Sequence, residues 1–300
     1  MAGRKRKMTV AATHGQCGSL NERNNKTVKS SVSTTCENAG CVETEQSRYF
    51  SKNPQHRLGE DFFNQPCICL AKAFLGKVLV RRCADGTELR GRIVETEAYL
   101  GGDDKASHSA GGKRTNRNTA MFMKPGTIYV YPIYGIYLCM NVSSEGEGAA
   151  VLLRSLEPLQ GQPAMRELRA ARRRETARQL KDKELCNGPS KLCQALNIPR
   201  CFDRRDLASD PEVWLETDPD KSPAKPPDIV SAPRIGIESH GEWAKKPWRF
   251  YLRGHSCVSV VNKDAEMQTL SGNVMNDSGL SDVQPETGKH NVKKILQKYS

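Results

Sequence analysis

Apolar and polar residues follow different patterns in three parts of the chain. Residues 1–55 and 263–300 contain few large apolar side chains, so we expect a disordered basic N-terminal tail and a disordered C-terminal tail. Residues 56–262 contain short apolar runs separated by turn residues, which is typical of an ordered domain. The helices predicted there are one over 61–75, one over 165–181 that is either helical throughout or flexible at its end, and one that follows a loop within 185–196. The predicted strands are 77–82, 92–99, 149–156, 234–237 and 249–261, with a hairpin over 127–144 and a surface loop over 219–233.

The strand predicted over 92–99 brings acidic residues together. Because side chains alternate between the two faces of a strand, Glu95, Glu97 and Tyr99 should project from one face, with Val94 and Ala98 on the other. Two carboxylates and an aromatic ring on one surface suit catalysis. A solvated strand face explains the same pattern and is favoured on this stretch alone. The spacing does not choose between Glu95 and Glu97.

The segment 127–144 predicts a hairpin with Tyr134 at or near its tip, because two alternating runs flank Pro132 and Gly135. Alternation gives one aliphatic face suited to a core: Ile128, Val130, Ile136, Leu138, Met140 and Val142. The opposite face carries Tyr129, Tyr131, Tyr137, Cys139 and Asn141. Tyrosines on a strand face are often ordinary packing, but a bulky aromatic at a loop tip is harder to explain that way, since tips face solvent.

Arginine is placed differently in the next two elements. Arg154 interrupts the apolar strand over 149–156, so it needs a carboxylate, a phosphate or an opening to water. The predicted helix over 165–181 carries several arginines against few acids. Its charges indicate a solvated surface, with contact to phosphate as an addition.

Composition narrows the class of partner. Hydrophobic residues make up 37% of the chain, which is enough to form a core. The net charge of +12 favours binding to a polyanion. No apolar run approaches the roughly 18 residues of a membrane span, and no secretory signal is recognisable, so we expect a soluble intracellular protein without membrane contact. The run Arg4-Lys5-Arg6-Lys7 is either a nuclear import signal or a tail that touches DNA, and both readings indicate the nucleus.

The cysteines argue against disulfides and against a metal. Eleven cysteines are scattered along a chain without a secretory signal, so reduced thiols are expected. Their closest pairs do not form the two spaced ligand pairs of a structural zinc site, and no histidine stands beside them at ligand spacing. We therefore predict no metal.

Several unusual segments occur in order with matching spacing, at 87–99, 121–127, 127–144, 152–154 and 188–193. They closely resemble the vertebrate alkyladenine DNA glycosylases, also called 3-methyladenine or N-methylpurine DNA glycosylases. The resemblance covers about 56–262 and leaves both tails out. It implies a mixed α+β single domain with a curved antiparallel β-sheet, flanking helices and a protruding hairpin, needing no cofactor.

Carried over residue by residue, the resemblance assigns the general base to Glu97 and the side chain that enters the duplex to Tyr134. Asn141 takes the position that disfavours the exocyclic amine of guanine. Arg154 matches an active-site arginine, and Ile235 matches a residue whose backbone carbonyl helps to hold the nucleophilic water. The base pocket falls on Tyr99, His108, Tyr131, Cys139 and Leu152.

The implied activity is that of a monofunctional DNA repair glycosylase. Such an enzyme rotates a damaged purine out of double-stranded DNA, because the duplex hides the glycosidic bond, and hydrolyses that bond with an activated water. The expected lesions are 3-methyladenine, 7-methylguanine, ethenoadenine and hypoxanthine, and the product is an abasic site that initiates base excision repair. We expect a monomer in the nucleus, with the mitochondrion as a second compartment and downstream repair proteins as partners.

Two other functions fit parts of the sequence. A metal-dependent nuclease could use Glu95, Glu97, Asp103 and Asp104 as oxygen ligands for Mg²⁺. A noncatalytic nucleic-acid-binding module would need only the basic balance and the tyrosine face. A chelator separates the first from the glycosylase, and an assay for base release separates both.

Overall fold

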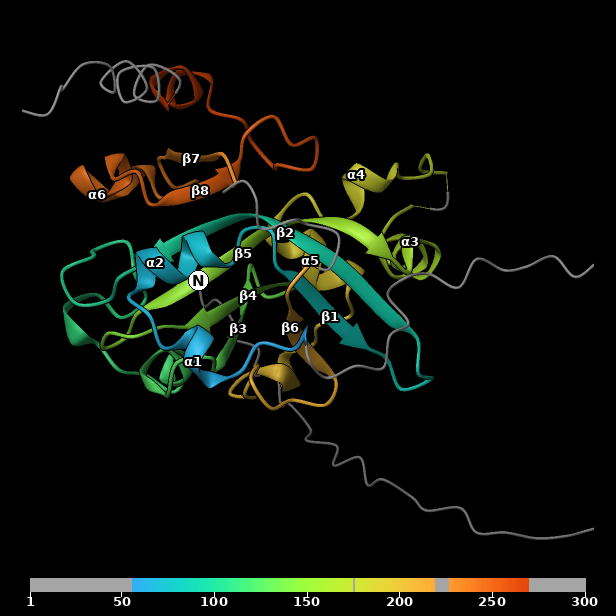
Figure 1. Ribbon diagram of the computed structural model, residues 1–300, viewed down its shortest axis with the longest axis horizontal. Helices are drawn as coiled ribbons and strands as arrows, with labels where there is room; N and C mark the ends of the chain where they lie inside the picture. Colours follow the sequence, from blue (N-terminus) through green and yellow to red (C-terminus); the bar gives the residue numbers. More distant parts are fainter. Residues whose placement is uncertain (1–55, 175, 219–226, 270–300) are drawn as a thin grey trace, which may run out of the picture. The chain divides into compact units, whose positions relative to one another are not determined.

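The computed structural model describes residues 56–174, 176–218 and 227–269 (Figure 1). The predicted N-terminal tail, with its basic run, and residues 270–300 lie outside the described residues. The helices are α1 (Glu60–Phe63), α2 (Cys67–Ala73), α3 (Gln162–Ala170), α4 (Asp182–Leu185), α5 (Pro189–Ala195) and α6 (Glu242–Lys245). The strands are β1 (Val78–Arg82), β2 (Glu88–Tyr99), β3 (Ile128–Ile133), β4 (Tyr137–Ser143), β5 (Ala150–Gln160), β6 (Val213–Glu216), β7 (Ile229–Ala232) and β8 (Arg249–Leu252).

The strands form one antiparallel sheet in the order β3-β4-β5-β2-β1-β6. The long strand β2 lies beside β5 and shares its other edge between β1, at residues 88–92, and β8, at residues 95–97 (Figure 1). Strand β8 also pairs with β7. Register shifts interrupt the β2–β5 ladder around Gly91 and Glu95, and such irregularities bend a strand. The predicted mixed α+β fold with an antiparallel sheet is confirmed.

The two faces of β2 have different environments, as its alternation predicts. Val94 and Ala98 belong to the main apolar core, and the Thr96 hydroxyl between them donates a hydrogen bond to the Ala71 carbonyl of α2 at 2.8 Å. Glu95 and Glu97 project from the other face and contact arginines. The core therefore fixes which side of the sheet carries the carboxylates.

The hairpin of β3 and β4 has the predicted register. Ile128 lies opposite Val142, and Val130 lies opposite Met140, and all four side chains are fully buried in the main core. Ile136 is an exception, because it lies in the turn and is 61% exposed. The predicted aliphatic face is correct along the strands and wrong at the turn, where the two-residue alternation no longer holds.

Several predicted boundaries are wrong. The helix over 61–75 is divided into α1 and α2, and the strand over 249–261 ends at Leu252. The helix expected over 165–181 ends at Ala170. The residues after it are mostly exposed and rich in arginine, so they bury little that could stabilise further helical turns. Residues 234–237 form a loop, and the strand lies just before it at β7, inside the segment predicted as a surface loop. Residues 263–269 are helical and Ala265 belongs to an apolar cluster with Val230 and Tyr251, so the ordered part extends beyond residue 262. No helix in the described ranges is long and apolar enough to cross a membrane.

Candidate active site

One row of side chains crosses five strands of the sheet. Tyr129 on β3 lies opposite Asn141 on β4, Asn141 opposite Leu152 on β5, Leu152 opposite Glu97 on β2, and Glu97 opposite Arg249 on β8. Residues paired directly across neighbouring strands point to the same face of a sheet. Residues far apart in the sequence are thus aligned by strand register alone, and this alignment joins the acidic strand to the tyrosine hairpin.

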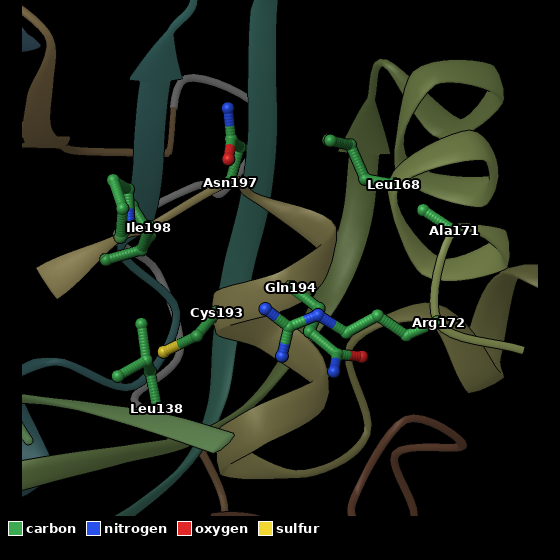
Figure 2. Close-up of a pocket in the computed structure, with 9 residues that line it drawn as sticks. Leu138, Leu168, Ala171, Arg172, Cys193, Gln194, Asn197 and Ile198 are labelled. Atoms are coloured by element: carbon green, nitrogen blue, oxygen red, sulfur yellow. The ribbon is translucent and has the colours of Figure 1, made fainter. Parts of the chain in front are cut away.

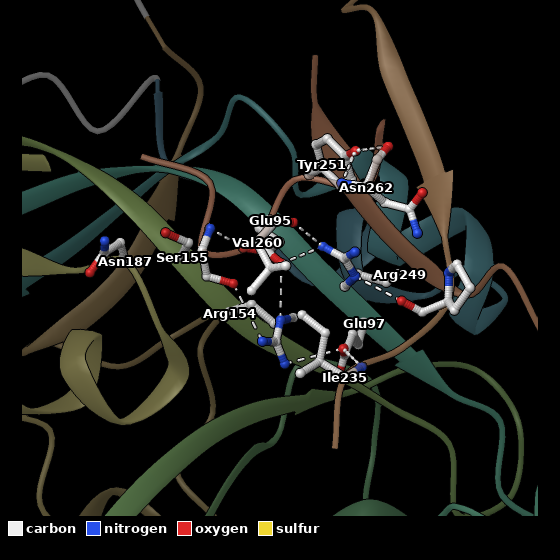
Figure 3. A network of polar contacts seen from close by, with 12 residues as sticks. Glu95, Glu97, Arg154, Ser155, Asn187, Ile235, Arg249, Tyr251, Val260 and Asn262 are labelled. Atoms are coloured by element: carbon white, nitrogen blue, oxygen red, sulfur yellow. Dashed lines mark hydrogen bonds and ion pairs between the residues drawn. The ribbon is translucent and has the colours of Figure 1, made fainter. Parts of the chain in front are cut away.

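Glu97 is fully buried and held by donors from three parts of the chain. Its Oε1 accepts from Arg154 Nη1 at 3.1 Å and from the Ile235 backbone N–H at 2.8 Å (Figure 3). Its Oε2 accepts from the Tyr99 hydroxyl at 2.9 Å. These donors fix the orientation of both carboxylate oxygens. The sheet therefore holds the Glu97 carboxyl group in one position beside Tyr99.

Glu95 is equally buried but faces other groups (Figure 3). Its Oε1 accepts from Arg154 Nε at 3.1 Å and from Arg249 Nη1 at 2.9 Å, and its Oε2 accepts from the Ser259 backbone N–H at 2.7 Å. None of these donors is an aromatic side chain, whereas Glu97 accepts a hydrogen bond from the Tyr99 hydroxyl. The contacts therefore distinguish two carboxylates that the sequence could not separate.

An aromatic cluster lies on the same side of the sheet as Glu97. The rings of Tyr129 and Tyr131 stack with centroids 5.2 Å apart, and the His108 ring meets Tyr131 edge-on at 4.6 Å. His108 Nδ1 lies 3.0 Å from the Tyr129 hydroxyl. Desolvation beside these rings, with a smaller contribution from the charge of Arg117, lowers the pKa of His108 to about 4, although part of the residue remains exposed to solvent. The imidazole is therefore neutral at physiological pH.

The tyrosines keep their protons as well. Burial, with the nearby charge of Glu97 as a smaller cause, raises the pKa of Tyr99 well above its ordinary value. Burial also raises the pKa of Tyr131 far above its ordinary value and that of Tyr129 to about 12. The cluster is thus uncharged, and its rings offer apolar faces and hydrogen-bonding edges without adding charge.

The loop that carries His108 is fixed by a buried ion pair. Asp104 accepts from Arg234 Nη1 at 2.6 Å and from Nη2 at 2.8 Å, and neither side chain is exposed. Arg234 also donates to the Ala98 carbonyl at 3.0 Å and lies 4.6 Å from the Tyr99 ring centroid. The end of β2, the His108 loop and the segment after β7 are therefore joined at one point.

The hairpin tip projects a tyrosine into solvent. Tyr134 is 90% exposed, and it has a φ of 51° followed by 73° at Gly135. Consecutive positive φ angles match the right-handed twist of hairpin strands, although a non-glycine residue adopts them at some cost. Arg172 Nη1 donates to the Ile136 carbonyl at 2.7 Å, which ties the turn to the segment after α3. The prediction of Tyr134 at the tip is confirmed.

The remaining predicted pocket residues lie around the row. Asn141 is 5% exposed and donates through Nδ2 to the Tyr129 carbonyl at 3.1 Å, so its side-chain orientation is fixed. Leu152 stands between Asn141 and Glu97. Cys139 is buried, its Sγ lies 3.8 Å from Ser190 Oγ, and burial raises the pKa of its thiol. The strands thus bring these three residues together with Glu97.

Sequence reasoning missed several contacts of the site. Arg249, which neutralises Glu95, lies in a short strand whose sequence gives no sign of an ion pair. The backbone N–H of Ile235 contacts Glu97, whereas the resemblance draws attention to its carbonyl. Tyr129 was assigned only to the polar face, yet its hydroxyl contacts His108. Only Arg154, within the apolar strand β5, indicated a partner in advance. The structure shows that its partners are the carboxylates of Glu95 and Glu97.

The four carboxylates of the nuclease alternative do not converge. Asp104 is committed to Arg234, Asp103 is exposed, and Glu95 and Glu97 are both paired with Arg154. Among the described residues, no group of three or more His, Cys, Asp or Glu side chains could hold a metal ion. Arginine-bound carboxylates are poor Mg²⁺ ligands because the guanidinium occupies the oxygens that the cation needs.

A cavity of about 260 Å³ lies away from this row, between α3, α5 and β4. Figure 2 shows Leu138, Leu168 and Ile198 around it, with Arg172 extending along one side. Its lining includes none of the residues predicted for the active site. The cavity is thus distinct from the surface formed by Glu97 and the aromatic cluster.

Comparison with known proteins agrees with the geometry. Residues 61–256 match the family model of methylpurine-DNA glycosylase. The chain is 61% identical over 227 residues to a human DNA-3-methyladenine glycosylase, covering 75% of this chain and 76% of that protein. It is 59% identical over 242 residues to the mouse protein of the same name, covering 80% and 72%.

A more distant relative shows the same match. A probable DNA-3-methyladenine glycosylase of Encephalitozoon cuniculi is 49% identical over 199 residues, covering 66% of this chain and 90% of that protein. The resemblance inferred from the sequence motifs is therefore confirmed. The chain belongs to the methylpurine-DNA glycosylase family and is a DNA repair enzyme that acts on N-glycosidic bonds in DNA.

Proposed function

We propose that this glycosylase removes alkylated and deaminated purines from double-stranded DNA, including 3-methyladenine, 7-methylguanine, ethenoadenine and hypoxanthine. One observation carries the proposal: Glu97, a buried carboxylate, shares a sheet face with Asn141 and with the rings of His108 and Tyr131. The names of the human and mouse relatives, both DNA-3-methyladenine glycosylases, support the same class of lesion.

Recognition begins with exposure of the damaged nucleotide. Rotating a base out of the duplex costs a few kcal/mol, and less when the base is damaged or mispaired. Tyr134, exposed at the hairpin tip, fills the gap that the base leaves. The extruded purine lies against Tyr99, His108 and Tyr131, where an electron-poor or cationic ring gains from contact with π faces. Neutral His108 does not repel such a cation.

Glu97 then carries the hydrolysis. Departure of the base leaves positive charge on the sugar, which a nearby carboxylate stabilises, and the same carboxylate takes a proton from the attacking water. Arg154 and the Ile235 N–H orient Oε1, and the Tyr99 hydroxyl orients Oε2. The Ile235 carbonyl helps to hold the water. Attack by water yields an abasic site with both DNA strands intact.

A duplex with one hypoxanthine or ethenoadenine tests this function. With a chelator present, the protein should release the lesion base and leave an abasic site that breaks only after alkali treatment. A duplex without the lesion is the control. Strand cleavage that needs no alkali and disappears with chelator would identify the nuclease, and binding without base release would identify a noncatalytic module.

Asn141 is proposed to exclude guanine. Its amide is fixed by the Tyr129 carbonyl and lies in the row with Glu97, where it meets the edge of a bound purine. Asn141→Ser should remove this obstruction and raise the release of undamaged guanine relative to hypoxanthine by about tenfold, the effect of one poorly accommodated group in a pocket.

The ratio of the two single-turnover rates measures this change. Asn187→Ser, at a half-buried position outside the row, is the matched control and should leave the ratio as in the wild-type protein. A folded Asn141→Ser variant with an unaltered ratio would show that another group excludes guanine.

A further inference from the structure

Two carboxylates and two arginines alternate in a buried chain beside the proposed catalytic centre (Figure 3). Arg249 contacts Glu95 at 2.9 Å, Glu95 contacts Arg154 at 3.1 Å, and Arg154 contacts Glu97 at 3.1 Å. The most exposed of the four is Arg154, at 6%. Their formal charges cancel. Arg154 contacts both Glu97, which faces the aromatic cluster, and Glu95, which does not.

The four residues come from three adjacent strands. Glu95 and Glu97 lie on β2, Arg154 on β5 and Arg249 on β8, on the two sides of β2. Arg249 is fixed further by donating to the Pro233 carbonyl at 2.8 Å and to the Val260 carbonyl at 2.7 Å. The second oxygen of Glu95 accepts from the Ser259 N–H. Glu95 therefore has no free oxygen toward the pocket and reaches Glu97 through Arg154.

We propose that Glu95 and Arg249 are positioning residues that determine how strongly the positive charge of Arg154 acts on Glu97. They thereby set the pH below which the rate of hydrolysis falls. This inference rests on the proposed role of Glu97 as general base. In a buried site, each formal charge acts on its neighbours more strongly than it would in water. A change of one charge at Glu95 or at Arg249 should therefore alter the proton affinity of the catalytic carboxylate.

The other groups around Glu97 do not mask this effect. Burial raises the pKa values of Tyr99, Tyr131 and Cys139, so these side chains are neutral at working pH. Of the other charges near the pocket, Arg234 is neutralised by Asp104, and Arg117 lies over the Tyr131 ring, 5.2 Å from its centroid. The groups that face Glu97 are Glu95 and Tyr99 on β2, Tyr131 on β3, Cys139 on β4, Arg154 on β5, Arg249 on β8 and the N–H of Ile235 in the loop after β7.

Two single variants should change the pH dependence in opposite directions. Glu95→Gln leaves excess positive charge, which favours the ionised form of the base, so the acidic limb of the single-turnover rate profile should move down by about one pH unit. The base is then weaker, and the plateau rate should fall about tenfold. Arg249→Met leaves excess negative charge, so the acidic limb should move up by about one pH unit.

The double variant Glu95→Gln/Arg249→Met tests the charge argument itself. It restores the net charge of the network, so its acidic limb should return to the wild-type position. It also lacks the uncompensated buried charge that can unfold either single variant. The measurement is the rate of hypoxanthine release from a duplex between about pH 4 and 9, with circular dichroism as the check on folding.

The outcomes separate this inference from the proposed function. Limbs that move in the same direction, or a double variant whose limb stays displaced, would overturn the charge-sharing role while leaving Glu97 as the base. Loss of rate without movement of any limb would show that Glu95 and Arg249 only support the fold. Full activity of Glu97→Gln would refute the general base itself.

Discussion

Replacing Glu97 by glutamine will abolish excision and spare recognition of the lesion. Glutamine keeps the size of the side chain but removes the charge that stabilises the sugar cation and the basicity that activates water. Loss of a general base typically costs about 10²–10⁴-fold in rate, and loss of the anion adds to this. In the proposed mechanism, base rotation depends on the aromatic cluster and on Tyr134, none of which is altered. Affinity for ethenoadenine duplex should therefore change little.

Single-turnover excision and duplex binding measure the two halves of this prediction. Glu157→Gln is the matched control, because Glu157 also lies on the sheet and pairs with Arg92 and His255, away from the row. It should retain the wild-type rate. Excision by a folded Glu97→Gln protein within tenfold of the wild type would show that the base was assigned to the wrong carboxylate.

Replacing Asp104 by asparagine should destabilise the protein strongly. Arg234 would remain buried without its carboxylate, and breaking a buried pair by removing one partner costs about 3–5 kcal/mol. Asp104 also accepts from the Leu100 and Ala106 backbone N–H groups, so the loop before His108 would lose much of its anchorage. We expect the melting temperature to fall on the order of 10 °C and excision to fall with it.

Thermal and denaturant unfolding measure the loss, and the neighbouring residue provides the control. Asp103 is exposed, so Asp103→Asn should change the free energy of unfolding by less than about 0.5 kcal/mol. Equal stability of the two variants would mean that the Asp104–Arg234 pair contributes no more than a surface ion pair does.

The sequence predicted the parts of the site that depend on local alternation. The period of two placed Glu95 and Glu97 on one face of β2, and the flanking runs placed Tyr134 at the hairpin tip; both are confirmed. Arg154 in β5 indicated a carboxylate, a phosphate or an opening to water as its partner, and the structure supplies the carboxylates of Glu95 and Glu97. These predictions succeed because strand geometry relates residues that are close in sequence.

The partners that distinguish the two carboxylates depend on strand pairing over long distances. Arg249 is 154 positions from Glu95 in the chain, and the Ile235 N–H is 138 positions from Glu97. Residues 234–237 were predicted as a strand, although Arg234 folds inward to Asp104 and leaves a loop. Alternation within a segment carries no information about such pairings, since sheet order and register are tertiary properties.

The Tyr134 turn bears on how the enzyme searches DNA. The tip holds its left-handed backbone in the free protein, tied by Arg172 to the segment after α3, so its shape requires no encounter with a lesion. In the proposed role of Tyr134, a projection of this kind tests the mechanical resistance of each base step before any chemical group is read. Steps that unstack easily yield first. We therefore expect time spent per step during scanning to follow the local flexibility of the duplex, with the aromatic cluster deciding only afterwards whether the extruded base is kept.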